Sequence, residues 1–220
     1  HKPALLHHHG SLFRKDPAHM LTMAAHLRMV SAVSTIDLTR PDPKLLNWLP
    51  TAYDLDELAA FGKEHTRKRD GRILVVSAPT NWAYKATAEL IAAVKVLQKD
   101  GVKIDLELVE GKTWRESLAA KARADIVFDQ VAFGYGCNAV EAWAFGIPVV
   151  AGADEWTLAE MRKRWGSLPF YTATVDTIGE RLRHLVESKD MRAEWGGHGL
   201  EHVRKYHAEK PALAILAELY

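Results

Sequence analysis

The chain contains 220 residues, of which 48% are hydrophobic and 26% are charged. These fractions are close to the averages for globular domains, so the composition excludes intrinsically disordered and collagen-like proteins. The 29 lysines and arginines nearly balance the 28 aspartates and glutamates, so we expect no whole-protein field that would steer nucleic acid.

Cysteine content and hydropathy narrow the class further. Cys137 is the single cysteine, which excludes an internal disulfide framework and a cysteine-based zinc cage. No apolar run approaches the roughly 18 residues that a membrane-spanning helix needs. The sequence shows no signal-peptide pattern, and we expect a cytoplasmic protein. Because the chain begins at His1 rather than methionine, we also expect a longer parent protein.

The first segment, residues 1–57, predicts a short or partial α/β domain. Its apolar residues 4–6 lead into three consecutive histidines and Gly10. A helix is expected over 18–27 and a strand over 29–33. One or two strands are too few to close a sheet, so this segment is typical of the tail of another α/β domain. Residues 62–71 are polar and basic, and we expect a linker over 58–71.

Residues 72–207 alternate between strand and helix patterns. Strands are predicted at 72–77, 102–109, 124–128, 147–151 and 169–172. Helices are predicted at 87–97, 114–122, 138–145, 158–165, 177–187 and 191–206. This alternation predicts the α/β class, with a Rossmann-like parallel sheet covered on both faces. Such sheets bind ligands at the carboxyl ends of their strands, beside helix N-termini. Residues 208–220 predict a final apolar helix.

A glycine-flanked turn before the predicted helix at 138–145 is the strongest local feature. Gly134 and Gly136 surround Tyr135, and glycines let backbone amides approach a ligand closely. The following helix N-terminus offers free N–H groups and a positive dipole end, which suit a phosphate. Glu141 lies in this helix among apolar neighbours, where a carboxylate needs a partner. Either a ribose hydroxyl pair or a nearby lysine or arginine would serve, and spacing alone favours neither.

This segment resembles the donor site of GT-B glycosyltransferases, particularly the large family 4 of retaining nucleotide-sugar enzymes. Glu141, followed by alanine and by Gly-Ile-Pro-Val-Val at 146–150, matches the second half of the family motif. In the family, an earlier glutamate contacts the donor sugar, and its place is taken here by Phe133. Phe133, or Asp129 four residues earlier, is therefore the expected sugar contact. The resemblance implies that Glu141 holds the ribose and that the turn lines the donor site through Gly134, Tyr135 and Gly136.

A second match follows the predicted strand at 72–77, in a loop that ends at Lys85 just before a helix. In the family, a lysine at this place binds the donor diphosphate and is usually followed by glycine, whereas Ala86 follows it here. Apart from the resemblance, an ammonium group at a helix N-terminus favours an anion; the alternative is an ordinary surface lysine. The resemblance implies donor-binding groups in this loop and the next: Thr80, Asn81, Lys85 and, as assisting cations, Lys112 or Arg115.

The histidine run carries a third match. The family places a histidine at the end of a strand, near the reacting sugar carbon, and His9 before Gly10 fits that place best. His8 is the rival. The alternatives are three partly exposed histidines, or a chance metal site formed with His19; a metal needs three or four converging ligands. We expect His9 to be catalytic and expect no bound metal.

We therefore expect a glycosyltransferase that moves a sugar from a nucleotide-diphosphate sugar, a UDP- or GDP-sugar, to a hydroxyl group of an unidentified acceptor. The resemblance implies a hexosyltransferase-like, metal-independent reaction without a cofactor, in which Lys85 and helix amides stabilise the leaving diphosphate. The alternatives are a phage-type enzyme that glycosylates a modified DNA base, a nucleotide-sugar epimerase, and a non-catalytic binding or scaffold module.

The expected architecture is GT-B-like. A short or truncated acceptor-side domain at 1–57 precedes a donor domain at 72–207, and the helix at 208–220 crosses back to the first domain or packs on the donor domain. A short first domain leaves apolar surface that a homodimer could cover. Basic clusters at 67–69 and 162–164 are expected to be solvated faces, although nucleic acid stays an alternative acceptor.

Overall fold

The structure, a computed structural model, describes residues 4–67 and 70–219. The chain folds into two compact units. The small unit combines the described residues up to Tyr53 with those from Lys205 onward, and the large unit runs from Asp54 to Arg204. Residues 55–64, which overlap the expected linker, form helix α3 (Leu55–Glu64) in the large unit. This helix packs on α5 (Trp114–Arg123) and α6 (Cys137–Ala144), so it is part of a packed layer.

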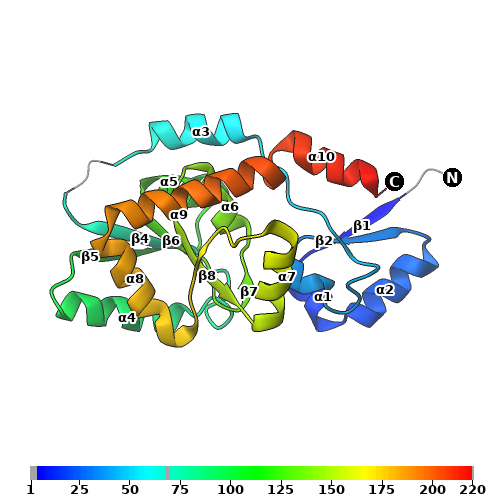
Figure 1. Ribbon diagram of the computed structural model, residues 1–220, viewed down its shortest axis with the longest axis horizontal. Helices are drawn as coiled ribbons and strands as arrows, with labels where there is room; N and C mark the ends of the chain where they lie inside the picture. Colours follow the sequence, from blue (N-terminus) through cyan, green and yellow to red (C-terminus); the bar gives the residue numbers. More distant parts are fainter. Residues whose placement is uncertain (1–3, 68–69, 220) are drawn as a thin grey trace. The chain divides into compact units, whose positions relative to one another are not determined.

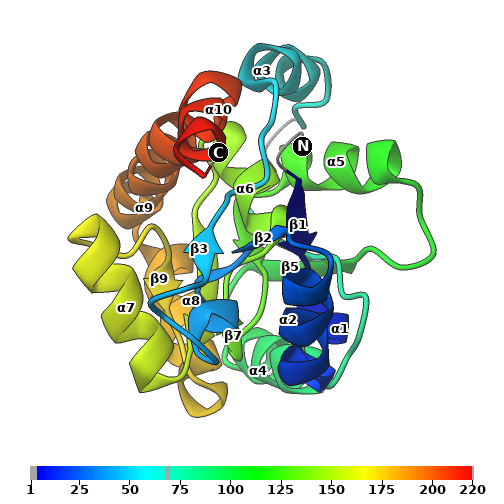
Figure 2. The same cartoon turned by 90° about the vertical axis from the view of Figure 1, so that its right-hand side faces the viewer.

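The small unit contains a parallel sheet in the order β1 (Leu5–His8), β2 (Val30–Val33) and β3 (Asn47–Trp48). Helices α1 (Gly10–Lys15) and α2 (Pro17–His26) lie beside these strands (Figure 2). A 3₁₀ helix, η1 (Ile36–Thr39), follows β2. The core gathers apolar side chains from several of these elements and the segment before β3: Phe13, Val33, Leu38 and Leu46. The third strand is one more than the sequence predicted, because two residues are too few to produce a periodic pattern.

The C-terminal helix α10 (Glu209–Glu218) belongs to the small unit. The backbone N–H of Tyr53 donates to the carbonyl of His207 at 2.8 Å, and Tyr53 forms an isolated parallel bridge with Ala208. The buried His207 imidazole also donates from Nδ1 to the carbonyl of Thr51 at 2.8 Å. These bonds tie the start of α10 to the segment after β3, which is the arrangement expected if the helix returns to the first domain.

The large unit contains a six-stranded sheet in the order β5 (Ile104–Leu108), β4 (Ile73–Ser77), β6 (Ile126–Phe128), β8 (Val149–Ala153) and β7 (Phe133–Gly134), with β9 (Tyr171–Thr172) paired to β8. All pairings are parallel except that of β7 with β8. The strands are short and rich in β-branched residues, which suits burial on both faces. This confirms the predicted α/β class with a Rossmann-like parallel sheet.

Helices cover both faces of this sheet (Figure 1). Helices α4 (Thr87–Lys99) and α8 (Ile178–Glu187) pack together on one side, and α5 and α6 lie on the other. Helix α9 (Lys189–His202) contacts both α6 and α8, and α7 (Glu155–Trp165) packs beside β7 and β8. The first of these faces buries a continuous apolar core that includes Leu90, Ile126 and Leu182.

Side-chain capping explains where α5 begins. Thr113 caps α5 by accepting the N–H of Glu116, and Glu116 accepts the N–H of Thr113 in return. This reciprocal capping box satisfies two otherwise unpaired donors.

A turn of π-helix, η3 (Val203–His207), connects α9 to α10. Within residues 4–67 and 70–219, no helix is long and apolar enough to cross a membrane.

Candidate donor site

Strand order places the site at one position of the large sheet. The chain leaves β4 for β5 on one side and later returns to place β6 on the other side. The carboxyl ends of two such strands diverge and leave a crevice, which is where α/β sheets bind their ligands. Lys85 lies in the loop after β4, and Asp129 directly follows β6. Their side chains meet in an ion pair between Lys85 Nζ and Asp129 Oδ1.

The Asp129 carboxylate links this lysine to helix α6. Its side chain is fully buried, and Oδ2 accepts the backbone N–H of Gly136 at 2.6 Å. Gly136 is the N-cap residue of α6. A Cβ atom at Gly136 would lie 3.6 Å from Asp129 Oδ2, an ordinary van der Waals contact. One buried carboxylate therefore holds an ammonium group and a helix N-terminus at the same strand ends.

A hollow of about 570 Å³ opens beside this helix N-terminus. It is bounded by the loops after β4 and β5 and by the first turns of α5 and α6. Its lining residues are Ala78, Pro79, Thr80, Val109, Glu110, Gly111, Lys112, Thr113, Trp114, Ser117, Lys121, Cys137, Asn138 and Glu141. Four of them are singled out by the sequence analysis: Thr80, Lys112, Cys137 and Glu141. The structure thus brings the predicted ribose carboxylate and a predicted donor loop to one hollow, which we call the strand-end pocket.

Glu141 has a protein partner in this pocket. Its Oε2 is ion-paired with Lys121 Nζ, and its Oε1 accepts the indole N–H of Trp114 at 2.9 Å. Lys121 also donates to Asn138 Oδ1 at 2.9 Å. Glu141 is 3% exposed and Lys121 is 1% exposed. Of the two partners that the sequence allowed for Glu141, the structure shows the lysine. Because each carboxylate oxygen can accept two hydrogen bonds, Glu141 can still accept a hydrogen bond from a ligand hydroxyl.

The Tyr135 side chain corrects one assignment of the sequence analysis. It is 5% exposed and its hydroxyl is hydrogen-bonded to His202 Nε2 at 2.9 Å. Its ring packs near Trp143 and Phe170 at centroid distances of 4.9 and 6.4 Å. The side chain therefore belongs to an aromatic core between α6, α7 and α9, where it cannot contact a donor. The position of Tyr135 between two glycines predicted a side chain at the donor site, but burial of its ring among other aromatic side chains decides where the side chain lies.

Of the two flanking glycines, Gly134 is required for backbone reasons, whereas Gly136 has an extended conformation that any residue can adopt. Gly134 has φ +89°, and a Cβ there would lie 2.2 Å from the Met161 side chain. Ala86, which replaces the family's glycine after Lys85, has φ +47°. A non-glycine residue in the left-handed region is strained by about 1–2 kcal/mol. The position after Lys85 thus adopts the backbone conformation that glycine would favour.

The other predicted donor residues differ in how close they lie to the strand-end pocket. Asn81 Oδ1 accepts the N–H of Tyr84 at 3.2 Å and so shapes the loop before Lys85. The ring of Phe133 lies edge-on to that of Tyr84, with centroids 5.6 Å apart. Arg115 is placed with its guanidinium 5.5 Å from the Phe61 ring centre, on α3, and it does not line the strand-end pocket. Lys112 does line the pocket, which makes it the better placed of the two assisting cations.

The three histidines differ in environment. His8 ends β1 and is 2% exposed, with its Nε2 hydrogen-bonded to Ser31 Oγ at 3.1 Å. His7 donates from Nε2 to the carbonyl of Leu49 at 2.9 Å. Burial and the nearby His9 lower the pKa of both His7 and His8. His9 is exposed and occupies the N-cap position of α1.

Among the described residues, no group of three metal-ligating side chains is placed to hold a metal ion, so the chance metal site with His19 is not formed there.

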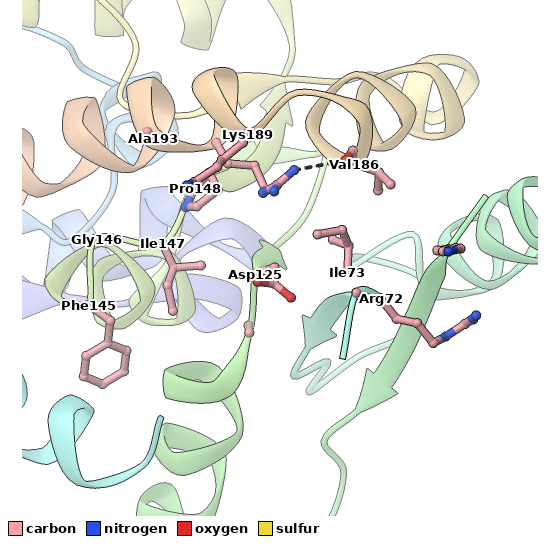
Figure 3. Close-up of a pocket in the computed structure, with 14 residues that line it drawn as sticks. Arg72, Ile73, Asp125, Phe145, Gly146, Ile147, Pro148, Val186, Lys189 and Ala193 are labelled. Carbon is pink, nitrogen blue, oxygen red and sulfur yellow. Dashed lines mark hydrogen bonds between the residues drawn. The ribbon is translucent and has the colours of Figure 1, made fainter. Parts of the chain in front are cut away.

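A second hollow, of about 780 Å³, lies at the opposite, amino ends of β4, β6 and β8 (Figure 3). Three of its charged side chains, Arg72, Asp125 and Arg192, are engaged within the protein. Arg72 points away from Asp125 in Figure 3 and pairs with Asp105 at 2.6 Å, while Asp125 pairs with Arg67 at 2.6 Å. Arg192 donates to the carbonyls of Leu185 and Val186 at 2.5 and 3.0 Å. The strand-end pocket is therefore the candidate site.

Comparison with solved structures identifies the fold. TarM from S. aureus matches with a TM-score of 0.61 at 12% identity, over 93% of this chain and 46% of that one. HepE from Anabaena, in complex with UDP and glucose, matches with a TM-score of 0.63 at 13% identity, over 99% of this chain and 70% of that one. The chain has the GT-B glycosyltransferase fold. This confirms the resemblance at the level of the fold.

Other comparisons define how far that likeness extends. The α,α-trehalose 6-phosphate synthase from Burkholderia multivorans matches with a TM-score of 0.66 at 12% identity, over 99% of this GT-B chain and 64% of the synthase. This chain thus spans only about half the length of TarM and about two thirds of the synthase. No protein-family model matches the sequence, and neither does any curated protein.

Two residues of the site were missed by the sequence analysis. Lys121 and Trp114 lie on α5, and their contacts with Glu141 span 20 and 27 residues. A lysine on the polar side of a predicted helix is ordinarily solvated, and no local pattern distinguishes Lys121 from its neighbours. For Trp114, the available signal was its position at the amino end of the helix after the second predicted strand, because that end faces the ligand edge of the sheet.

Proposed function

We propose that this chain carries the donor-binding half of a glycosyltransferase that transfers a sugar from a nucleoside-diphosphate sugar to a hydroxyl acceptor. The observation that carries the proposal is the juxtaposition of Lys85, Asp129 and the α6 N-terminus at the strand ends, beside a pocket lined by Glu141. HepE and TarM, which share the fold, were each crystallised with UDP, which supports a nucleotide ligand.

In this proposal each group has a defined task. The strand-end pocket receives the nucleoside, with Glu141 accepting a ribose hydroxyl. The diphosphate lies at the α6 N-terminus, where backbone N–H groups and the helix dipole favour negative charge, and Lys85 donates to it. When the bond between the sugar carbon and the phosphate oxygen breaks, the leaving diphosphate keeps the electron pair. Lys85 and the helix amides stabilise that charge electrostatically, and the acceptor oxygen bonds to the sugar carbon and releases its proton.

Ligand binding tests the donor site directly. A thermal-shift panel of UDP, GDP and the corresponding nucleotide sugars should raise the unfolding midpoint for one base, because a ligand that binds the folded state stabilises it by mass action. For each variant, the shift is the difference between its unfolding midpoints with and without nucleotide. Lys85→Ala and Glu141→Ala should reduce the shift, whereas Lys163→Ala, at an exposed lysine of α7, should keep it. Absence of any shift at millimolar nucleotide would overturn the proposal.

Turnover assays separate the chemistry from binding. With the nucleotide sugar identified by the panel, release of nucleoside diphosphate should require an acceptor and should persist in excess EDTA, because the proposed charge stabilisation uses Lys85 and backbone amides. Isomerised donor without an acceptor would instead indicate an epimerase, and binding without turnover would indicate a non-catalytic module. His9→Ala should lower kcat while leaving nucleotide binding unchanged if the exposed His9 has the predicted catalytic role.

A further inference from the structure

Lys121 is the most deeply buried cation in the described part of the large unit. Its residue is 1% exposed, and its ammonium group has two partners from α6, Glu141 and Asn138. Asn138 in turn donates from Nδ2 to the carbonyl of Ala78 at 3.0 Å, in the loop after β4. This chain of contacts runs from α5 through α6 to the donor loop and forms the polar wall of the strand-end pocket.

Burial of this kind needs a reason. Removing two opposite charges from water costs several kcal/mol for each ion, and their attraction offsets that cost only with good geometry and additional hydrogen bonds. An apolar pair of the same volume would serve packing equally well or better. The pair instead faces a pocket of about 570 Å³, where a carboxylate held in a fixed orientation has a use in ligand binding.

We propose that Lys121 is a positioning residue for nucleoside recognition: its ammonium group holds the Glu141 carboxylate aimed at the ribose hydroxyls. This inference rests on the proposed function. Lys121 occupies one carboxylate oxygen of Glu141 and the Trp114 indole occupies the other. The carboxylate is thereby held between two helices, with its remaining acceptor positions available at the pocket wall.

The Trp114 contact contributes to the same arrangement. Trp114 is 52% exposed and lines the pocket at the first position of α5, while its indole N–H is tied to Glu141 at 2.9 Å. The Glu141 carboxylate therefore accepts a hydrogen bond from the Trp114 indole and also fixes the orientation of that ring at the pocket. Losing Lys121 would leave Glu141 buried without its counter-charge and without one of the two contacts that fix the orientation of its carboxylate.

The role of Lys121 in ribose recognition can be measured as the ratio of the Kd of a 2′-deoxyribonucleotide to the Kd of the corresponding ribonucleotide. The experiment uses whichever of UDP or GDP binds the wild type, and compares its Kd with that of the 2′-deoxy form by calorimetry. A hydrogen bond to a charged group contributes about 1.5–3 kcal/mol, so the wild type should prefer the ribonucleotide by about tenfold or more. Taking the ratio within each variant cancels any uniform loss of affinity.

Three variants and one control complete the test. Lys121→Met and Glu141→Gln should each reduce the ribose preference to about threefold or less. The double variant should match Glu141→Gln alone, because Lys121 acts through Glu141. Lys163→Met, at an exposed lysine whose side chain is 78% accessible, should keep the wild-type ratio. If Lys121→Met unfolds, the comparison of the double variant with Glu141→Gln still decides, because it removes both charges together.

The outcomes separate the inference from the proposed function. A Lys121→Met variant that binds both nucleotides more weakly but keeps the wild-type ratio would overturn the inference, and so would a double variant that loses more than Glu141→Gln. A wild type that binds nucleotide without ribose preference would overturn the inference and leave the donor site standing. A wild type that binds neither UDP nor GDP would overturn the proposed function, and the inference with it.

Discussion

Lys85 and Asp129 lie 44 residues apart in the sequence, yet their ammonium and carboxylate groups form an ion pair between the ends of β4 and β6. The Asp129 side chain is fully buried, and that of Lys85 is 14% exposed. Because Asp129 also accepts the Gly136 N–H, this one contact links the loop after β4, the end of β6 and the start of α6.

Breaking this pair on one side should destabilise the fold. Lys85→Met leaves the Asp129 carboxylate buried without its counter-charge, which costs about 3 kcal/mol or more for a buried pair. Urea unfolding should show this as a lower midpoint. The double variant Lys85→Met with Asp129→Asn should recover much of the loss, because it leaves no uncompensated charge and the new side-chain amide still offers an oxygen to the Gly136 N–H. A double variant as unstable as the single one would contradict this account.

The backbone at Ala86 predicts a stabilising substitution. Ala86 has φ +47° and ψ 42° at the N-cap position of α4, where a Cβ atom is strained. Ala86→Gly should therefore raise the free energy of unfolding by up to about 1 kcal/mol, although glycine's greater freedom in the unfolded chain offsets part of the gain. Differential scanning calorimetry provides the measurement, with Ala93→Gly inside α4 as the control that should lose stability. A lower midpoint for Ala86→Gly would show that the local strain is relieved in another way.

Two glycines of α9 form a matched pair for packing. A Cβ at Gly199 would lie 1.9 Å from the Trp143 ring, whereas a Cβ at the exposed Gly197 would meet no atom within 4 Å. Gly199→Ala should destabilise the large unit by about 1–3 kcal/mol through overpacking. Gly197→Ala should stabilise it by up to about 1 kcal/mol through helix propensity. Chemical unfolding monitored by tryptophan fluorescence compares the two, and equal effects would refute the packing of α9 on α6 described above.

Acid should weaken the small unit through His207. Burial lowers the pKa of His207 to about 4 from an ordinary value of 6.5. Between these values the unfolded chain binds a proton that the folded chain does not, so the free energy of unfolding falls as the pH falls. The loss contributed by this group should be about 2 kcal/mol between about pH 7.5 and 5.

A variant isolates that contribution from those of other histidines. His7 and His8 also have lowered pKa values and act with the same sign. His207→Asn retains an N–H group that can donate to Thr51 but has no titration in this range. Its stability at about pH 7.5 should be lower than that of the wild type, and its further loss down to about pH 5 should be smaller by about 2 kcal/mol. Parallel pH profiles for the two proteins would show that His207 is solvated when folded.

Local patterns in the sequence accounted for most strands and helices of the large unit, the exceptions being α3, which overlaps the expected linker, and β7. The runs at 72–77 and 124–128 are continuous and β-branched, and the helix stripe at 87–97 repeats every three to four residues, so each specifies its element through its own burial. The parallel sheet follows from this alternation, and Lys85 lies at its carboxyl edge because it belongs to the loop after β4. The two-residue strands β3 and β7 carry no such period, because their pairing depends on a neighbouring strand rather than on their own side chains.

What the sequence determined by itself was the class of the fold and the positions of Lys85, in the loop after β4, and Glu141, in α6, near the carboxyl edge of the sheet where we propose that the donor binds. What only the tertiary structure decided was which partners those charges take: Asp129 for Lys85, and Lys121 for Glu141. It also decided that the Tyr135 side chain enters the aromatic core and that α10 joins the small unit. Periodicity is a property of consecutive residues, whereas ion pairing and burial depend on which distant segments the folded chain brings within a few ångströms of each other.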